Sequence, residues 1–323
     1  MSVTLQTVST DEAEIRLDRW FRRQFPHLTQ GALQKLCRSG QIRVDGKRAE
    51  PATRLQPGQS VRVPPMANAL RPAPPPPSIT PDDREAVEAM VLYADEQVIV
   101  LNKPAGLATQ GGPGITRHVD YLLEGLRHEQ HGKPRLVHRL DRDTSGLLLL
   151  ARTPGVAATL AASFRGRDVH KTYWAVVVGR PQPTEGIIDM DLVRIGKGPG
   201  ALTIAADADD PEAAHALTEY VLRDSAGRKL SWLELSPLTG RTHQLRVHCE
   251  ALGTPILGDP RYGGERAHMD GFADRLHLHA RALDLPHPAG GRLTLAAELP
   301  GHMAQTFRTL GFEAPKPPPA QRR

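Results

Sequence analysis

Charged side chains crowd one short segment, residues 135–146, which reads Arg-Leu-Val-His-Arg-Leu-Asp-Arg-Asp-Thr-Ser-Gly. Leu136 and Val137 precede the charges and four leucines, residues 147–150, follow them. This pattern predicts a loop held at both ends by buried elements, with Asp141 at its centre. A loop held in this way can aim a catalytic carboxylate. The residues alone also allow a plain surface turn, in which the Asp and Ser side chains accept hydrogen bonds from the backbone.

The segment resembles the signature of the RluA-type RNA pseudouridine synthases, in which the aspartate after Arg-Leu is the catalytic residue. Other blocks similar to those of the family lie at residues 102–107, 171–175, 238–246 and 255–263, in the family's order. Several blocks in one order leave little room for chance agreement. The resemblance covers most of the chain.

The resemblance implies that Asp141 is the catalytic residue, that Arg241 is its guanidinium partner, and that the uracil stacks on Tyr173. A buried carboxylate stays ionised only beside a cation, and a guanidinium can hold it bidentately. Further contacts to RNA are expected from Leu245, Arg142, His138, Lys171 and Arg139. Neither a cofactor nor a metal is expected.

Several of these roles have a structural alternative of similar weight. Leu245 fits a core position equally well, and Arg142 could pair with Asp143 instead of meeting a phosphate. We expect His138 to order the loop by hydrogen bonds, because the family chemistry assigns it no proton transfer. The chemical route also stays open: the carboxylate could attack sugar C1′, add to uracil C6, or remove the C2′ proton to give a glycal.

Two other functional classes were weighed against a synthase. Asp141 and Asp143 could form the acid and base of a hydrolase, but no further acidic cluster accompanies them. A non-catalytic S4-type RNA-binding or ribosome-assembly protein would have lost a catalytic residue. Asp141, Tyr173 and Arg241 are all present.

The composition fits a soluble, RNA-binding protein of one or two domains. The chain has 323 residues, 39% of them apolar, and a net charge of +5. Cys37 and Cys249 are the only cysteines, which suggests neither a disulfide framework nor a zinc site and fits a reducing cytoplasm. Neither a signal peptide nor a membrane-spanning run is evident, and we expect a cytoplasmic monomer.

The first part of the chain is rich in arginine and predicts a small RNA-binding module at residues 13–65. Apolar residues recur with helical spacing around residues 15–21, and Thr29 can cap a second helix. Strands are expected at residues 42–48 and 60–63, the first with an Asp45-Gly46 turn. This order of elements resembles an S4 domain, which implies phosphate contacts from Arg16, Arg19, Lys35, Arg38, Ser39 and Arg43.

The remaining boundaries follow from proline content and hydrophobic patterning. Residues 1–12 are expected to form a tail, residues 66–85 a proline-rich linker, residues 86–313 the catalytic domain and residues 314–323 a disordered tail. Strands are predicted at residues 98–101, 146–151, 173–178, 231–236 and 276–280, and helices at 155–164 and 241–252.

Strands outnumber helices without regular alternation, which predicts an α+β fold with a large, mainly antiparallel mixed sheet and flanking helices. The S4 module makes the chain most similar to the RluC/RluD subgroup. That similarity implies large-subunit (23S) ribosomal RNA as substrate, with transfer RNA as the alternative.

Overall fold

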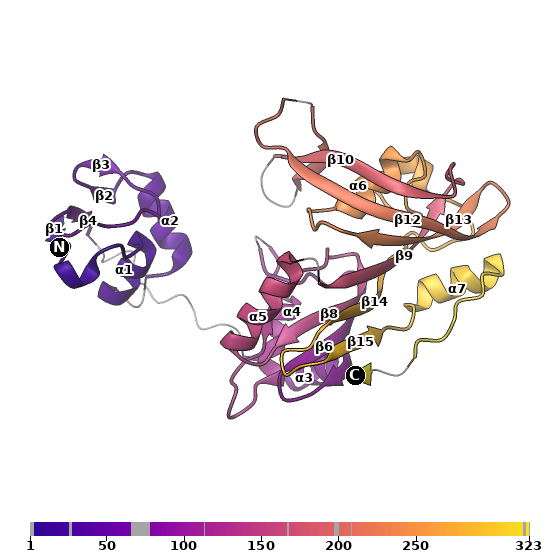
Figure 1. The fold of residues 1–323 in the computed structure, drawn as a ribbon, viewed down its shortest axis with the longest axis horizontal. Coiled ribbons are helices and arrows are strands. Elements are labelled where there is room, and N and C mark those ends of the chain that lie inside the picture. Colours follow the sequence, from indigo (N-terminus) through magenta and orange to yellow (C-terminus); the bar gives the residue numbers. More distant parts are fainter. Residues whose placement is uncertain are drawn as a thin grey trace. The chain divides into compact units, whose positions relative to one another are not determined.

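The chain forms two compact units, Met1–Ser78 and Ile79–Arg323, in a computed structural model (Figure 1). The structure describes residues 3–25, 28–65, 78–112, 114–166, 168–196, 200–207, 209–318 and 321–322. Residues 66–77, which hold most of the expected linker, lie outside this description. In the described part of the chain, no helix has the length and apolar character needed to cross a membrane.

The first unit has the predicted order of two helices and a small sheet. Helices α1 (Leu17–Gln24) and α2 (Gln30–Arg38) pack on a sheet of order β1-β4-β2-β3, formed by β1 (Thr4–Thr7), β2 (Arg43–Val44), β3 (Lys47–Arg48) and β4 (Ser60–Val63). The Thr29 hydroxyl caps α2 by accepting from the amide of Ala32 at 3.2 Å, as its side-chain type predicts. The expected tail at residues 1–12 is wrong, because β1 pairs antiparallel with β4 and so belongs to this sheet.

The second unit is built on one twelve-stranded sheet. Its main path is β11-β10-β12-β13-β9-β14-β8-β6-β5, with β15, β16 and β7 paired at its side. The strands are β5 (Val91–Ala94), β6 (Val98–Lys103), β7 (Arg135–Leu136), β8 (Ser145–Ala151), β9 (His170–Val178), β10 (Glu185–Ile195), β11 (Leu202–Ala205), β12 (Ala214–Ala226), β13 (Leu230–Pro237), β14 (Leu278–Pro286), β15 (Arg292–Ala296) and β16 (Gln321–Arg322). Strand β14 runs parallel to β8, and the other pairs among the described strands are antiparallel. The predicted mixed, mainly antiparallel sheet is confirmed.

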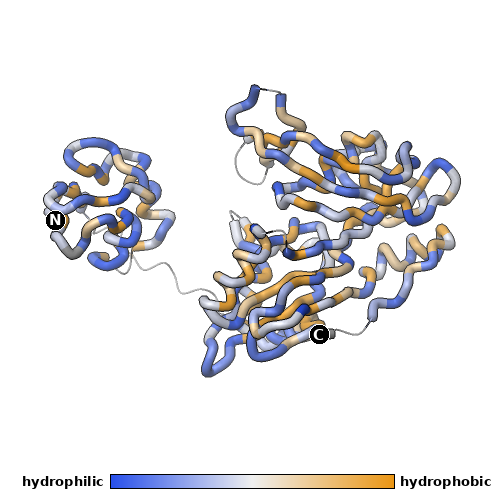
Figure 2. Tube along the Cα trace, in the orientation of Figure 1, coloured by the Kyte–Doolittle hydropathy of each residue, from blue (hydrophilic) through white to orange (hydrophobic). Residues whose placement is uncertain are grey.

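Helices cover the sheet and bury its central strands. They are α3 (Pro81–Glu88), α4 (Val119–Leu122), α5 (Pro154–Arg165), α6 (Gln244–Ala251) and α7 (Gly301–Leu310), with 3-10 turns η3 (Leu123–Leu126) and η5 (Gly264–Ala267). Leu147 and Leu149 of β8 share a core with α5, whereas Leu148 and Leu150 share a core with α3 and α4. Burial on both faces explains why β8 reads as a continuous apolar run, visible in Figure 2.

The parallel contact between β8 and β14 depends on a glycine. Gly146 pairs with Ala280 and has φ +109°, and a Cβ at this position would lie 2.3 Å from the Ala280 carbonyl oxygen. Only glycine permits this backbone conformation and this close approach. Gly146 thereby joins the end of the Asp141 loop to β14.

Two boundaries of the second unit differ from the sequence expectation. Helix α3 begins at Pro81 and is capped by the Thr80 hydroxyl, so the unit starts before residue 86. The described residues of the expected tail at 314–323 also make contacts with the second unit. Arg281 donates a hydrogen bond to the Pro315 carbonyl, Ala314 packs on an aromatic core, and β16 pairs with β15.

Candidate active site

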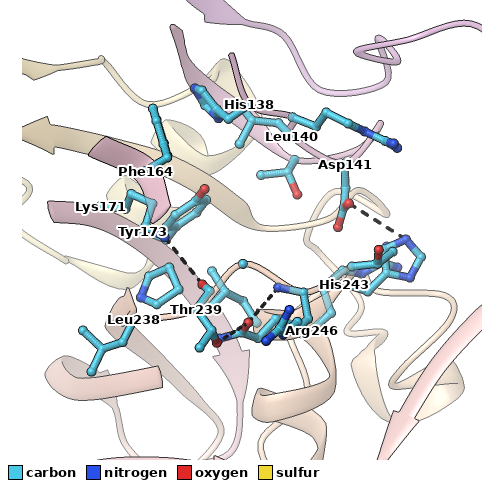
Figure 3. A pocket seen from close by; sticks show the side chains of 18 of the residues that line it. His138, Leu140, Asp141, Phe164, Lys171, Tyr173, Leu238, Thr239, His243 and Arg246 are labelled. Carbon is cyan, nitrogen blue, oxygen red and sulfur yellow. Dashed lines mark hydrogen bonds and ion pairs between the residues drawn. The ribbon is translucent and has the colours of Figure 1, made fainter. Parts of the chain in front are cut away.

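A pocket of about 820 Å³ opens in the second unit beside the Asp141 loop. Residues of the loop before β8, of α5, of β9 and of the segment between β13 and α6 line it. The predicted site residues that it gathers are Asp141, Tyr173, Arg241, Leu245, His138, Lys171 and Arg139. Figure 3 labels four of them, Asp141, Tyr173, His138 and Lys171. Segments far apart in the sequence therefore meet around one cavity of nucleotide size.

Lys103, the last residue of β6, anchors the Asp141 loop by hydrogen bonds. The Lys103 ammonium is fully buried and donates to the carbonyls of Pro104, Leu107 and Arg142 at 3.0, 2.8 and 3.0 Å. Burial lowers the pKa of Lys103 to about 8, opposed by the charges of Asp143 and Asp141. An ammonium has three donors, so each is used here.

A second anchor lies on the other side of Asp141. The Thr109 hydroxyl donates to the Leu140 carbonyl at 2.6 Å and accepts from the Leu140 amide at 3.2 Å. Residues before and after Asp141 are thus both tied to the segment that follows β6. The sequence predicted a loop held at its ends, and the structure adds hydrogen bonds to the residues on either side of Asp141.

His138 orders the loop, as expected. Its Nε2 accepts a hydrogen bond from the Leu149 amide at 2.9 Å, and its ring stacks on Phe164 at a centroid separation of 4.8 Å. Burial, and less strongly the charge of Lys171, lower the pKa of His138 to about 4. The imidazole is therefore neutral at neutral pH and acts as an acceptor for β8.

Asp141 faces α6 rather than Arg241. Its carboxylate is 29% exposed, and its Oδ1 lies 4.0 Å from Nε2 of His243 (Figure 3). Arg241 is exposed and donates from Nε to the His215 carbonyl at 2.9 Å. Among the residues that the structure describes, no ion pair joins Arg241 to Asp141. The predicted pairing is therefore not observed, because Arg241 lies in the turn before α6 and its guanidinium reaches toward β12.

Arg246 is the buried guanidinium on the Asp141 side of the pocket. Its Nε and Nη2 bond to Asp259 at 2.7 and 2.6 Å, and both side chains are nearly inaccessible. Burial works against its charge, but the hydrogen bond and charge of Asp259, and more weakly the charge of Asp141, raise the pKa of Arg246. Arg246 therefore stays cationic, and its charge interacts with that of Asp141 across the pocket wall.

Tyr173 presents its ring to the pocket from β9. The residue is half-buried and packs between two apolar clusters of the second unit. Burial, and less strongly the charge of Asp141, raise the pKa of Tyr173 well above its usual value. The phenol therefore keeps its proton at neutral pH and can both stack with a base and donate a hydrogen bond.

Two other pocket residues have structural contacts as well. Leu245 is buried in the core that it shares with Leu233 and Leu278, so it is both a core residue and part of the pocket wall. The Lys171 ammonium lies 3.5 Å from the Thr239 carbonyl, and burial lowers its pKa. Each has a structural contact that does not prevent contact with a substrate.

Gln244 fixes the segment that leads into α6. Its side-chain oxygen accepts from the Thr239 hydroxyl at 2.8 Å and from the Arg241 amide at 2.9 Å. Its amide nitrogen donates to the Leu217 carbonyl and to the Thr218 hydroxyl. A fully buried amide with both ends satisfied sets the start of the helix, which explains why α6 begins later than the predicted residue 241.

Comparison with known proteins agrees with this geometry. The family description "RNA pseudouridylate synthase" matches residues 97–251, and "S4 domain" matches residues 15–61. The chain is 37% identical over 294 residues to the ribosomal large subunit pseudouridine synthase C of Rickettsia bellii, an alignment that covers 89% of this chain and 95% of that protein. The chain belongs to the RNA pseudouridylate synthase family. This confirms the assignment made from the sequence blocks.

Other relatives extend the comparison across the same family. The ribosomal large subunit pseudouridine synthase C of Escherichia coli K12 is 33% identical over 301 residues, covering 90% of this chain and 91% of that protein. The mitochondrial RNA pseudouridine synthase 4 of Arabidopsis thaliana is 34% identical over 385 residues, covering 94% and 80%. The solved structure of human RNA pseudouridylate synthase domain containing 4 superposes with a TM-score of 0.60 at 29% identity, covering 72% of this chain and 97% of that one.

In this pseudouridylate synthase, several residues near the pocket lie in the family-like sequence blocks but received no role from the sequence. His243 and Arg246 lie in the block at residues 238–246, and Asp259 and Tyr262 lie in the block at residues 255–263. The signal was present as charged and aromatic residues beside recognised motifs. Their roles depend on contacts between α6 and the segment after it, which residue spacing does not reveal.

The remaining predicted contacts divide between exposed and internally bonded residues. Arg142 is 67% exposed, donates to the Gly106 carbonyl and lies 3.9 Å from the Asp143 carboxylate, so the pairing with Asp143 that the residues allowed is present. It lies outside the pocket lining. In the S4 unit, the exposed predicted contacts with neither an ion pair nor a side-chain hydrogen bond among the described residues are Arg19, Lys35 and Arg38. Arg16 pairs with Asp18 at 2.7 Å, and Arg43 donates to the Gly40 carbonyl. Ser39 donates to a carbonyl of its own helix.

Within the ranges that the structure describes, no group of three or more His, Cys, Asp or Glu side chains is arranged to hold a metal ion. Cys37 and Cys249 are both buried, in different units. Burial raises the pKa of the Cys249 thiol to about 12, which keeps it protonated at neutral pH.

Proposed function

We propose that this protein converts uridines of large-subunit (23S) ribosomal RNA to pseudouridine, with Asp141 as the catalytic carboxylate. The observation that carries the proposal is the position of Asp141 at a nucleotide-sized pocket that is also lined by Tyr173 and the buried cation of Arg246. The reaction breaks the bond between uracil N1 and sugar C1′ and forms a bond from C5 to C1′. The C5 proton leaves and N1 gains one, so atoms and electrons balance within the nucleotide.

Each group has a step that suits its protonation state. The Asp141 carboxylate reacts with the nucleotide, with the buried cation of Arg246 in the same pocket lining. Tyr173 stacks on the uracil, and its protonated hydroxyl can donate a hydrogen bond in the pocket. The target base must leave its stack to reach this pocket, which costs about a few kcal/mol. Arg142, exposed at the rim of the loop, is suited to hold a phosphate or fill the vacated position.

Ribosomal RNA is the proposed substrate because relatives over nearly the whole chain carry the name of ribosomal large subunit pseudouridine synthase C. The S4 unit supports the same substrate, since its exposed Arg19, Lys35 and Arg38 offer phosphate contacts in addition to the pocket. The proposal includes a cytoplasmic monomer that needs neither a metal nor a cofactor. Transfer RNA is the competing substrate class.

The deciding experiment maps pseudouridine in total ribosomal and transfer RNA from cells with and without the gene, complemented by wild type or by Asp141→Asn. We expect sites in large-subunit ribosomal RNA to disappear without the gene and to return only with the wild type. Sites lost from transfer RNA alone would transfer the proposal to that substrate. Restoration of the sites by Asp141→Asn would remove Asp141 from the chemistry.

The S4 contribution is tested by neutralising its exposed cations. Replacing Arg19, Lys35 and Arg38 together with glutamine should weaken RNA binding and reduce the slope of log affinity against log salt by about two, at roughly 0.7 for each lost contact to single-stranded RNA. Binding is measured on a ribosomal RNA fragment at salt concentrations from about 50 to about 300 mM. An unchanged salt slope would contradict the phosphate contacts.

A further inference from the structure

We propose that His243 and Tyr262 are positioning residues, which form a directed hydrogen-bond relay that orients the Asp141 carboxylate. The inference rests on the proposed function, because it assigns a role within the same reaction. It starts from a chain of contacts that leaves β11, passes through the segment after α6 and ends at Asp141. No step of the synthase mechanism described above uses either residue.

The first contact of the relay comes from the backbone. The amide of Thr203 in β11 donates to the Tyr262 hydroxyl oxygen at 3.0 Å. The same hydroxyl lies 2.7 Å from Nδ1 of His243. A phenol has one proton to donate and two lone pairs to accept with. The Thr203 amide uses one of the acceptor positions, and among the residues that the structure describes only Nδ1 of His243 is within reach of the hydroxyl proton, so we assign the hydroxyl as the donor to His243.

This polarity fixes the tautomer of His243. Burial lowers the pKa of His243 below its usual value, although the charge of Asp141 opposes the shift, so the ring is neutral at neutral pH. A neutral imidazole carries one proton. With Nδ1 accepting from Tyr262, that proton is on Nε2, the nitrogen that faces Oδ1 of Asp141. The relay therefore presents an N–H donor to the carboxylate.

Both residues are held firmly in this arrangement. His243 occupies the left-handed region with φ 54°, as the residue before α6, and its side chain is 15% exposed. The Arg246 guanidinium lies over the Tyr262 ring at 4.9 Å, and the Tyr262 amide donates to Asp259 at 3.1 Å. A non-glycine residue with positive φ at a pocket is a strained position that the surrounding contacts must maintain.

The final gap to Asp141 is 4.0 Å, longer than a hydrogen bond. Contacts of this kind commonly tighten when substrate fills a catalytic pocket. Closing the gap would bind one carboxylate oxygen and leave the other for the nucleotide. The relay thereby fixes the direction from which Asp141 reacts, without supplying or removing a proton itself.

The test uses variants that remove single links with little change elsewhere. His243→Asn removes the reach to Asp141 while keeping a side chain that tolerates the left-handed backbone. Tyr262→Phe removes the hydroxyl and keeps the ring beneath Arg246. Tyr220→Phe is the matched control, because its hydroxyl bonds to the Pro183 carbonyl on the sheet, outside the pocket lining.

Single-turnover rate and RNA affinity are measured on the same ribosomal RNA fragment for the full-length chain. We expect each relay variant to lower the rate about tenfold, the effect of one hydrogen bond, with affinity and melting temperature close to wild type. The control should keep the wild-type rate. The double relay variant should be no slower than the slower single variant, because both changes break one path.

Each outcome bears on the relay or on the reaction. Rates within twofold of wild type for both relay variants, or losses that multiply in the double variant, overturn the relay. A purely structural role would lower affinity and melting temperature together with the rate, and this result also overturns it. A wild type that forms no pseudouridine, on any RNA, refutes the proposed function itself, which a slow relay variant of an active enzyme does not.

Discussion

Asp259→Asn should destabilise the second unit strongly, because it removes the charge that balances Arg246. Both carboxylate oxygens bond to the guanidinium, and Oδ1 also accepts from the amides of Arg261 and Tyr262. The two side chains are 4% and 0% exposed, so water cannot replace the lost charge. An asparagine would also turn an N–H group toward the guanidinium. Removing one partner of a buried ion pair costs about 3–5 kcal/mol of unfolding free energy.

Urea unfolding of the full chain measures this loss, with the fluorescence of Trp174 and Trp232 reporting on the second unit. The matched control is Asp284→Asn, which breaks the ion pair between Asp284 and Arg292. The Arg292 side chain is 45% exposed and that of Asp284 is 35% exposed. An exposed pair is worth about 0–1 kcal/mol. Equal losses for the two variants would refute the claim that burial sets the cost. A loss below about 1 kcal/mol for Asp259→Asn would do the same.

Three further predictions concern the loop and the stacking residue. Lys103→Met should abolish a gain in stability at alkaline pH. The pKa of Lys103 is about 8 in the folded protein against an ordinary value of 10.5, so between these pH values the unfolded wild type binds more protons than the folded wild type. Its unfolding free energy therefore rises across this range by roughly 3 kcal/mol relative to the variant. Parallel pH profiles of unfolding would contradict this. Gly146→Ala should cost at least about 3 kcal/mol in urea unfolding through its clash with Ala280, whereas Gly155→Ala, which meets no atom within 4 Å, should change little. Tyr173→Phe should slow the single-turnover rate at unchanged RNA affinity, whereas Tyr173→Ala should weaken affinity about tenfold; equal affinities would remove the stacking role.

The sequence predicted best those features that neighbouring residues determine. The apolar run of β8 and the Thr29 cap of α2 are local patterns, and the structure confirms both. The exposed turn at Asp45 and Gly46, with φ of 48° and 77°, follows from residue type in the same way. Strands β10 and β12 were missed because their residues alternate with polar ones and one face lies open to solvent.

Features that depend on contacts between distant segments could not be predicted in this way. The family resemblance led to Arg241 as the partner of Asp141, but of the two arginines in the pocket lining Arg246 is buried, whereas Arg241 is exposed and bonds to the His215 carbonyl. Similarly, residues 1–12 looked like a tail because a strand of four residues has too little pattern to stand out before its partner β4 is known. Spacing along the chain does not tell which of two neighbouring arginines is buried in an ion pair and which stays exposed.

Strand β14 has a consequence for the order in which the enzyme matures during synthesis. It lies between β8 and β9, which follow each other in sequence, yet its own residues, Leu278–Pro286, are translated about a hundred residues later. Until β14 leaves the ribosome, the two halves of the sheet lack the strand that joins them, and the pocket lacks the wall to which Leu278 belongs. The earlier segments can form local structure while the chain grows, but the pocket cannot be complete until β14 has been inserted. A nascent chain shorter than this is therefore a synthase without a finished substrate pocket.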